Sequence, residues 1–246
     1  MAALAGAAAM AWIVAALFFR HEADTDPIAV RWAMSVLAAW FVVCGVWTYT
    51  RVQTRLSGVF LWYCALSGIH WGGPIGIGSS HLQSIELAAF VVVGSVLTQS
   101  VFLDLVLRMK FVADDRKLKH GWIPYLPMVP GGILFLGISL RPEDASLLAL
   151  LSGMYALAVL MSLIGGLLLI ARPFSMRENR LGNAIVAAAF VVGWLPHGLV
   201  SGGLVEANVP EGYFNLPLAL APLALAWWIV TFSSRFSTAP TRPDAA

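Results

Sequence analysis

Four side chains that can bind a metal ion or move a proton lie near the ends of apolar stretches of this chain. They are His70, His81, Glu86 and His197. Imidazole and carboxylate groups bind zinc, iron and copper, so convergence of these residues would form a metal site or line a cavity for a small polar ligand such as a quinone. The simpler interpretation is that these residues lie at helix ends, where water satisfies their polar groups, and the sequence identifies no cofactor.

Asp104 and Arg108 are four residues apart within one apolar stretch. This spacing places both on one side of a helix, so the sequence predicts a local ion pair. A proton relay is the alternative, and it would need a second partner within the membrane. The hydroxyl and amide side chains of this stretch are predicted to form hydrogen bonds with neighbouring helices or to line a small ligand path. They are Gln83, Ser95, Thr98, Gln99 and Ser100.

Five of the fifteen lysine and arginine residues lie within a short segment between two apolar stretches. They are Arg108, Lys110, Arg116, Lys117 and Lys119. Such a cluster attracts anionic lipid head groups by about 1 kcal/mol per basic residue near the surface, and it could equally bind an acidic protein partner. Asp114 and Asp115 interrupt it, so it also has a simpler interpretation, in which it only fixes the topology.

The composition predicts that all these side chains are positioned by helices in a membrane. Hydrophobic residues make up 59% of the 246 residues and charged residues only 11%, against about 25% charged in soluble domains. Backbone groups in lipid must be satisfied within each segment, so the apolar runs are predicted to be helices. The eight runs cover residues 3–19, 29–49, 56–72, 82–107, 123–140, 146–171, 181–203 and 214–233.

The predicted fold is therefore all-α, a polytopic membrane bundle of about eight transmembrane helices over residues 1–236. Residues 237–246 are predicted to be a disordered cytoplasmic tail. Of the fifteen lysine and arginine residues, twelve fall in alternate loops and the tail on one side, and three on the other. Cytoplasmic loops carry this excess, so both termini are predicted to be cytoplasmic. We expect no nucleic-acid partner.

The order of several motifs resembles the amino-terminal, eight-span membrane sensor module of ComP-like bacterial histidine kinases. The motifs are DTDP at 24–27, WIPYLP at 122–127, RENR at 177–180 and the Leu/Pro/Ala run at 216–226. The resemblance covers almost the whole chain and implies a membrane sensing or docking module in a bacterial inner membrane. Such kinases continue into a phosphoacceptor helix and an ATP-binding domain, which nothing in this sequence resembles, so the resemblance implies that a signal passes through a partner protein.

The sequence thus favours a non-catalytic membrane sensor or scaffold that binds a ligand, a lipid or a protein partner such as a kinase. The alternatives are a structural subunit of a larger membrane complex, a small-solute carrier, and an intramembrane metal-dependent lipid hydrolase. The last is broadly similar to the seven-span ceramidase and receptor superfamily, and it would use the histidines as metal ligands and Glu86 as a base. No two histidines share the i, i+4 spacing of a helical metal site, which weighs against it.

Overall fold

The computed structural model describes residues 28–72, 85–111, 121–140, 145–171, 180–201 and 215–233, and within these ranges the chain is helical, with no strand. This part of the chain confirms the all-α class. The elements are α2 (Ile28–Arg51), α3 (Arg55–Gly72), α4 (Ile85–Phe111), η3 (Ile123–Tyr125), α5 (Met128–Leu140), α6 (Ala145–Ala171), α7 (Arg180–Ser201), η5 (Leu216–Ala219) and α9 (Leu220–Ser233).

Three described helices are long and apolar enough to cross a membrane. The qualifying segments are Trp32–Arg51 in α2, Val91–Met109 in α4 and Ala149–Leu169 in α6. Other apolar helical segments are shorter: Ile123–Ile138, Ala184–Leu195 and Leu216–Phe232. The predicted first span and the predicted tail lie outside the described residues, so the count of eight spans and the cytoplasmic position of both termini stay predictions.

Prolines divide two of the predicted spans into a short 3-10 helix followed by a short α-helix. Pro124 lies in the first turn of η3, before α5, and Pro217 lies in the first turn of η5, before α9. Proline lacks a backbone N–H and has a fixed φ, so it fits a first turn without loss of a hydrogen bond. Neighbouring helices can compensate for a proline in a helix interior, such as Pro196 in α7. The fifth and eighth apolar runs therefore begin in a 3-10 turn, and their α-helices start at Met128 and Leu220.

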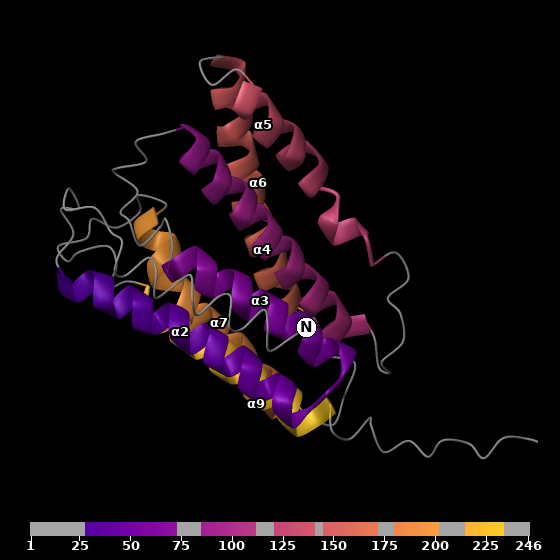
Figure 1. The fold of residues 1–246 in the computed structure, drawn as a ribbon. Helices are drawn as coiled ribbons and strands as arrows, with labels where there is room; N and C mark the ends of the chain where they lie inside the picture. Colours follow the sequence, from indigo (N-terminus) through magenta and orange to yellow (C-terminus); the bar gives the residue numbers. More distant parts are fainter. Residues whose placement is uncertain are drawn as a thin grey trace, which may run out of the picture.

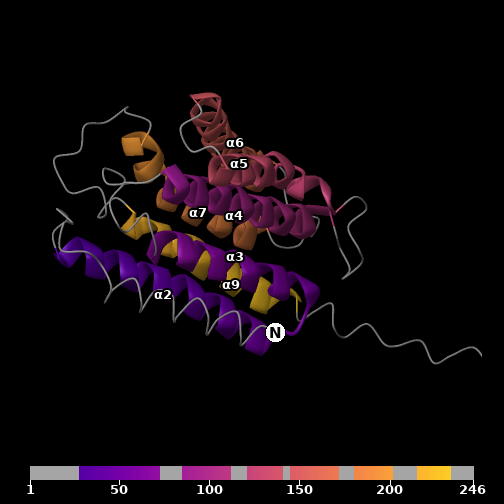
Figure 2. The ribbon, with the colours of Figure 1, turned by 45° about the horizontal axis from the view of Figure 1, so that its top comes forward.

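A short turn joins α2 to α3, and the two helices lie side by side (Figures 1 and 2). Thr54 and Ser57 form a reciprocal cap at the start of α3. The Thr54 backbone N–H donates to Ser57 Oγ at 3.0 Å, and the Ser57 backbone N–H donates to Thr54 Oγ1 at 3.2 Å. The helices approach closely at Gly45, where an added Cβ would lie 2.7 Å from Cys64 Cβ. The turn and the small residue together fix this helix pair.

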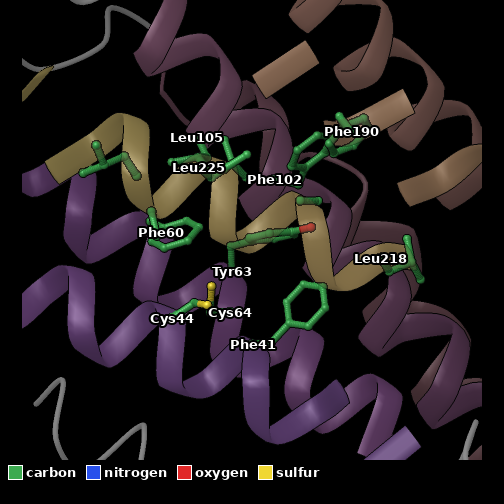
Figure 3. Packing of buried hydrophobic residues seen from close by; sticks show 14 of the residues in the cluster. Phe41, Cys44, Phe60, Tyr63, Cys64, Phe102, Leu105, Phe190, Leu218 and Leu225 are labelled. Atoms are coloured by element: carbon green, nitrogen blue, oxygen red, sulfur yellow. The ribbon is translucent and has the colours of Figure 1, made fainter. Parts of the chain in front are cut away.

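The larger hydrophobic cluster joins α2, α3, α4, α7 and α9, with Leu169 added from α6. Aromatic rings lie at its centre (Figure 3). The Phe102 ring centroid lies 5.4 Å from that of Tyr63 and 4.9 Å from that of Phe190, and the Phe102 and Phe190 rings are nearly parallel. Trp40 adds a polar contact between α2 and η5, because its Nε1–H donates to the Ala219 carbonyl oxygen at 3.0 Å.

A second hydrophobic cluster joins the first half of α4 to α5 and α6. Its buried members include Val96, Leu134, Ile138 and Met154. α4 belongs to both clusters, and it lies between the α2–α3 pair and the α5–α6 pair in both views (Figures 1 and 2). A displacement of α4 would therefore disturb the packing of both groups of helices.

The outer side of α6 presents large apolar side chains that no described residue covers. Leu160, Leu163 and Leu167 are each more than half exposed. A continuous apolar face of this kind is unfavourable in water and is satisfied by another apolar surface or by lipid. The exposed face of α6 thus agrees with its length and composition, which suit a membrane span.

Candidate functional site

The described structure places one side chain of the predicted metal or ligand site, that of His70. His81 lies outside the described residues. Glu86 and His197 fall within α4 and α7, but their side chains are outside the description. Among the described side chains there is no group of three or more His, Cys, Asp and Glu residues that could hold a metal ion. Convergence of the four predicted residues therefore stays a prediction.

His70 lies in the last turn of α3 and contacts α4. Its Nδ1 is 3.4 Å from Ser95 Oγ, and the Ser95 hydroxyl donates to the Val91 carbonyl oxygen at 2.8 Å. Ser95 Oγ therefore contacts both its own helix and the imidazole, and the tautomer of His70 sets the direction of the second contact. The Trp71 ring meets the imidazole edge to face, with centroids 5.2 Å apart. These contacts connect the end of α3 to the middle of α4.

The hydroxyl groups of α4 otherwise bond within their own helix. Ser95, Thr98 and Ser100 each donate at 2.8 Å to the carbonyl oxygen four residues earlier. Ser95 also contacts His70 of α3, as predicted for a bond between helices, whereas the described bonds of Thr98 and Ser100 stay within α4. The physical reason is that a serine or threonine side chain can reach the i−4 carbonyl, which satisfies the hydroxyl without a partner helix.

Asp104 is the centre of a buried polar cluster that also contains Arg108 and Tyr125, and we call these three residues the Asp104 cluster. Arg108 Nε lies 2.9 Å from Asp104 Oδ1. The Tyr125 hydroxyl donates to Asp104 Oδ2 at 3.1 Å. Each carboxylate oxygen therefore has its own partner, one from the next turn of α4 and one from η3. The cluster fixes the start of the fifth apolar run against the end of the fourth.

The charges of the Asp104 cluster are almost wholly removed from water. The side chains of Asp104 and Arg108 are 3% and 10% exposed. Burial of a single carboxylate would cost several kcal/mol, which a paired opposite charge offsets. Arg108 Nε and Asp104 Oδ1 lie close but are not aligned as a hydrogen bond, so their attraction is mainly Coulombic, and the aligned hydrogen bond to the carboxylate comes from Tyr125.

The sequence pairs Asp104 with Arg108 through their helical spacing, but it does not indicate Tyr125. Tyr125 is 21 residues from Asp104, and its position depends on how η3 turns back onto α4. The sequence feature that bears on this contact is the proline-rich start of the fifth run, which indicates an irregular first turn there. A tyrosine at such a turn, near the depth of a charged pair, is a natural hydrogen-bond donor.

The structure describes little of the basic segment. Arg108 lies in α4, Lys110 lies in α4 with its side chain outside the description, and Arg116, Lys117 and Lys119 lie outside the described residues. The segment connects the Arg108 end of α4 to Trp122 and η3, so the Asp104 cluster lies at its base.

A scan against models of protein families and searches of curated proteins and of solved structures found no match to this chain.

Proposed function

We propose that this chain is a multi-pass protein of a bacterial inner membrane that acts as a non-catalytic sensor or scaffold through a partner protein. The observation that carries the proposal is the position of α4. This helix contributes to both hydrophobic clusters, contacts His70 through Ser95, and ends in the Asp104 cluster beside the basic segment.

The geometry supports transmission along α4 better than it supports catalysis. A ligand or lipid that moved α3 against α4 would act at the contact between His70 and Ser95, 3.4 Å apart. A rigid helix would carry that displacement to Asp104, two to three turns further along. There it would change the hydrogen bond from Tyr125, and with it the base of the basic segment. Packed interfaces change between discrete arrangements, which suits a switch of this kind.

Affinity purification of the tagged protein from native membranes in mild detergent tests the proposal. We expect a kinase or another membrane-complex subunit at near-equal amounts, identified by mass spectrometry. The double substitution Arg116→Ala and Lys117→Ala should abolish its recovery without changing membrane insertion. The matched control, Arg51→Ala with Arg235→Ala, removes two positive charges on the same predicted side and should keep the partner.

Two results would count against the proposal. Recovery of the wild-type chain alone would remove the partner on which it depends. A stoichiometric metal ion in the purified protein, together with lipid turnover, would favour the hydrolase alternative instead.

A further inference from the structure

The guanidinium of Arg108 has N–H donors for which the described part of the chain offers no acceptor. Arginine carries five N–H groups on its guanidinium, and here only Nε lies against a carboxylate, that of Asp104. Among the described residues, no acceptor forms a hydrogen bond or ion pair with the two terminal amino groups. The side chain is nevertheless 90% buried, since it is only 10% exposed. A charged group so enclosed is costly unless an acceptor completes it.

Asp104 does not supply this acceptor through its described contacts. One of its oxygens faces Arg108 Nε and the other accepts from Tyr125. Asp104 therefore holds the guanidinium by one edge, and Tyr125 holds Asp104 in turn. The terminal amino groups form the opposite edge, and no described residue of the bundle supplies an acceptor for them.

The position of Arg108 along α4 indicates which acceptor is near. The apolar, membrane-length segment of α4 ends at Met109, one residue beyond Arg108. Across the connection, Trp122 and Leu126 flank η3 with exposed side chains, and tryptophan is enriched at the level of lipid head groups. Arg108 thus lies where an apolar helix leaves the hydrocarbon layer, which is the depth of lipid phosphates.

We propose that Arg108 binds the phosphate of an anionic phospholipid through its terminal amino groups, with Asp104 and Tyr125 as positioning residues. The planar guanidinium matches a phosphate with two parallel N–H···O bonds, which lysine cannot form. The nearby basic segment disfavours the cationic head group of phosphatidylcholine and favours phosphatidylglycerol. The inference rests on the membrane placement in the proposed function and does not depend on a protein partner.

Native mass spectrometry of the full-length protein in detergent, titrated with phosphatidylglycerol or phosphatidylcholine, tests this site. We expect wild-type protein to retain phosphatidylglycerol in preference to phosphatidylcholine. Arg108→Gln should weaken phosphatidylglycerol binding roughly tenfold or more, as expected for the loss of charge-assisted hydrogen bonds. Arg51→Gln, which removes an exposed arginine from the last turn of α2, should leave binding within about twofold.

Two further variants and a competition with inorganic phosphate complete the test. If Arg108→Gln does not remain monodisperse, Arg108→Lys replaces it; it keeps the charge and should still bind phosphatidylglycerol more weakly than wild type. Asp104→Asn should weaken binding although Arg108 remains, because the guanidinium loses its anchor. Equal affinity of the Arg108 and Arg51 variants would overturn the proposal. Displacement of the lipid by an equal concentration of inorganic phosphate would also overturn it, since the ligand would then be a soluble anion.

The lipid titration uses purified protein alone, so its result is independent of partner recovery. A partner without a lipid site would leave the proposed function standing, and a lipid site without a partner would leave the Arg108 assignment standing.

Discussion

Gly165 of α6 lies directly against the ring of Phe102, which makes Gly165→Ala a sharp test of the packing between α4 and α6. A Cβ at Gly165 would lie 2.5 Å from Phe102 Cε1 and 2.9 Å from Cδ1. The ring has little room to move, because it stacks on Phe190 and packs on Tyr63 (Figure 3). Overpacking of a core by one methyl group costs about 1–3 kcal/mol, and we expect a loss of stability in this range.

Gly153 provides a matched control on the same helix. No atom lies within 4 Å of the Cβ that Gly153→Ala would add. In a membrane the dissociated helix stays helical, so the usual helix-propensity gain of alanine should largely cancel. We expect Gly153→Ala to change stability by less than about 0.5 kcal/mol, as is usual at unpacked positions.

Thermal unfolding in detergent, followed by the loss of monodisperse protein, measures the difference. For a chain of this size the expected cost lowers Tm by roughly 2–12 °C. Combination with Phe102→Leu, which removes the ring, should recover part of the loss, with a coupling of at least about 0.5 kcal/mol. Equal melting of the Gly165 and Gly153 variants, or strict additivity with Phe102→Leu, would refute the described packing.

Two further substitutions test the α2–α3 pair. Gly45→Ala would place a Cβ 2.7 Å from Cys64 Cβ and should lower the free energy of unfolding by about 1–3 kcal/mol. The control Gly94→Ala, whose added Cβ has no atom within 4 Å, should be nearly neutral. The same melting assay compares the two variants, and an unchanged Tm for Gly45→Ala would contradict the close approach. Ser57→Ala removes the side chain that accepts from the Thr54 N–H and should lower the free energy of unfolding by about 1 kcal/mol. The loss should appear as a lower Tm and as faster amide exchange at the α2–α3 turn. Unchanged exchange would show that the cap does not stabilise the turn.

The helices of the described ranges could be predicted from the sequence because apolar runs bounded by polar residues fix helix positions almost by themselves. The run 29–49 appears as α2 (Ile28–Arg51) and the run 146–171 as α6 (Ala145–Ala171). Boundaries shifted more where prolines occur, because proline selects a first turn and its effect on a whole run depends on the neighbouring helices. The α5 helix therefore begins at Met128, and η3 takes up the start of that run.

The candidate site was also predictable only in part from the sequence. Helical spacing alone brings Asp104 within reach of Arg108, and the structure shows their atoms 2.9 Å apart. Tyr125 could not be assigned to them, since its contact depends on tertiary structure. The partners of the α4 hydroxyl groups could not be predicted, because a serine that bonds its own helix and one that bonds a neighbouring helix have the same local sequence pattern.

Stability alone does not explain the Asp104 cluster. Replacement of a buried ion pair by apolar residues is often neutral or stabilising, and α4 is otherwise well suited to an all-apolar interface at this end, where Leu105 and Val106 are fully buried. A leucine at position 104 would pack there without any desolvation cost, but it could neither accept from Tyr125 nor hold the Arg108 guanidinium. The carboxylate instead orients the Arg108 side chain. It holds one edge of the guanidinium, whose other edge has no acceptor among the described residues. That geometry accounts for the charge pair as a means of presenting Arg108 to an anion at the end of α4.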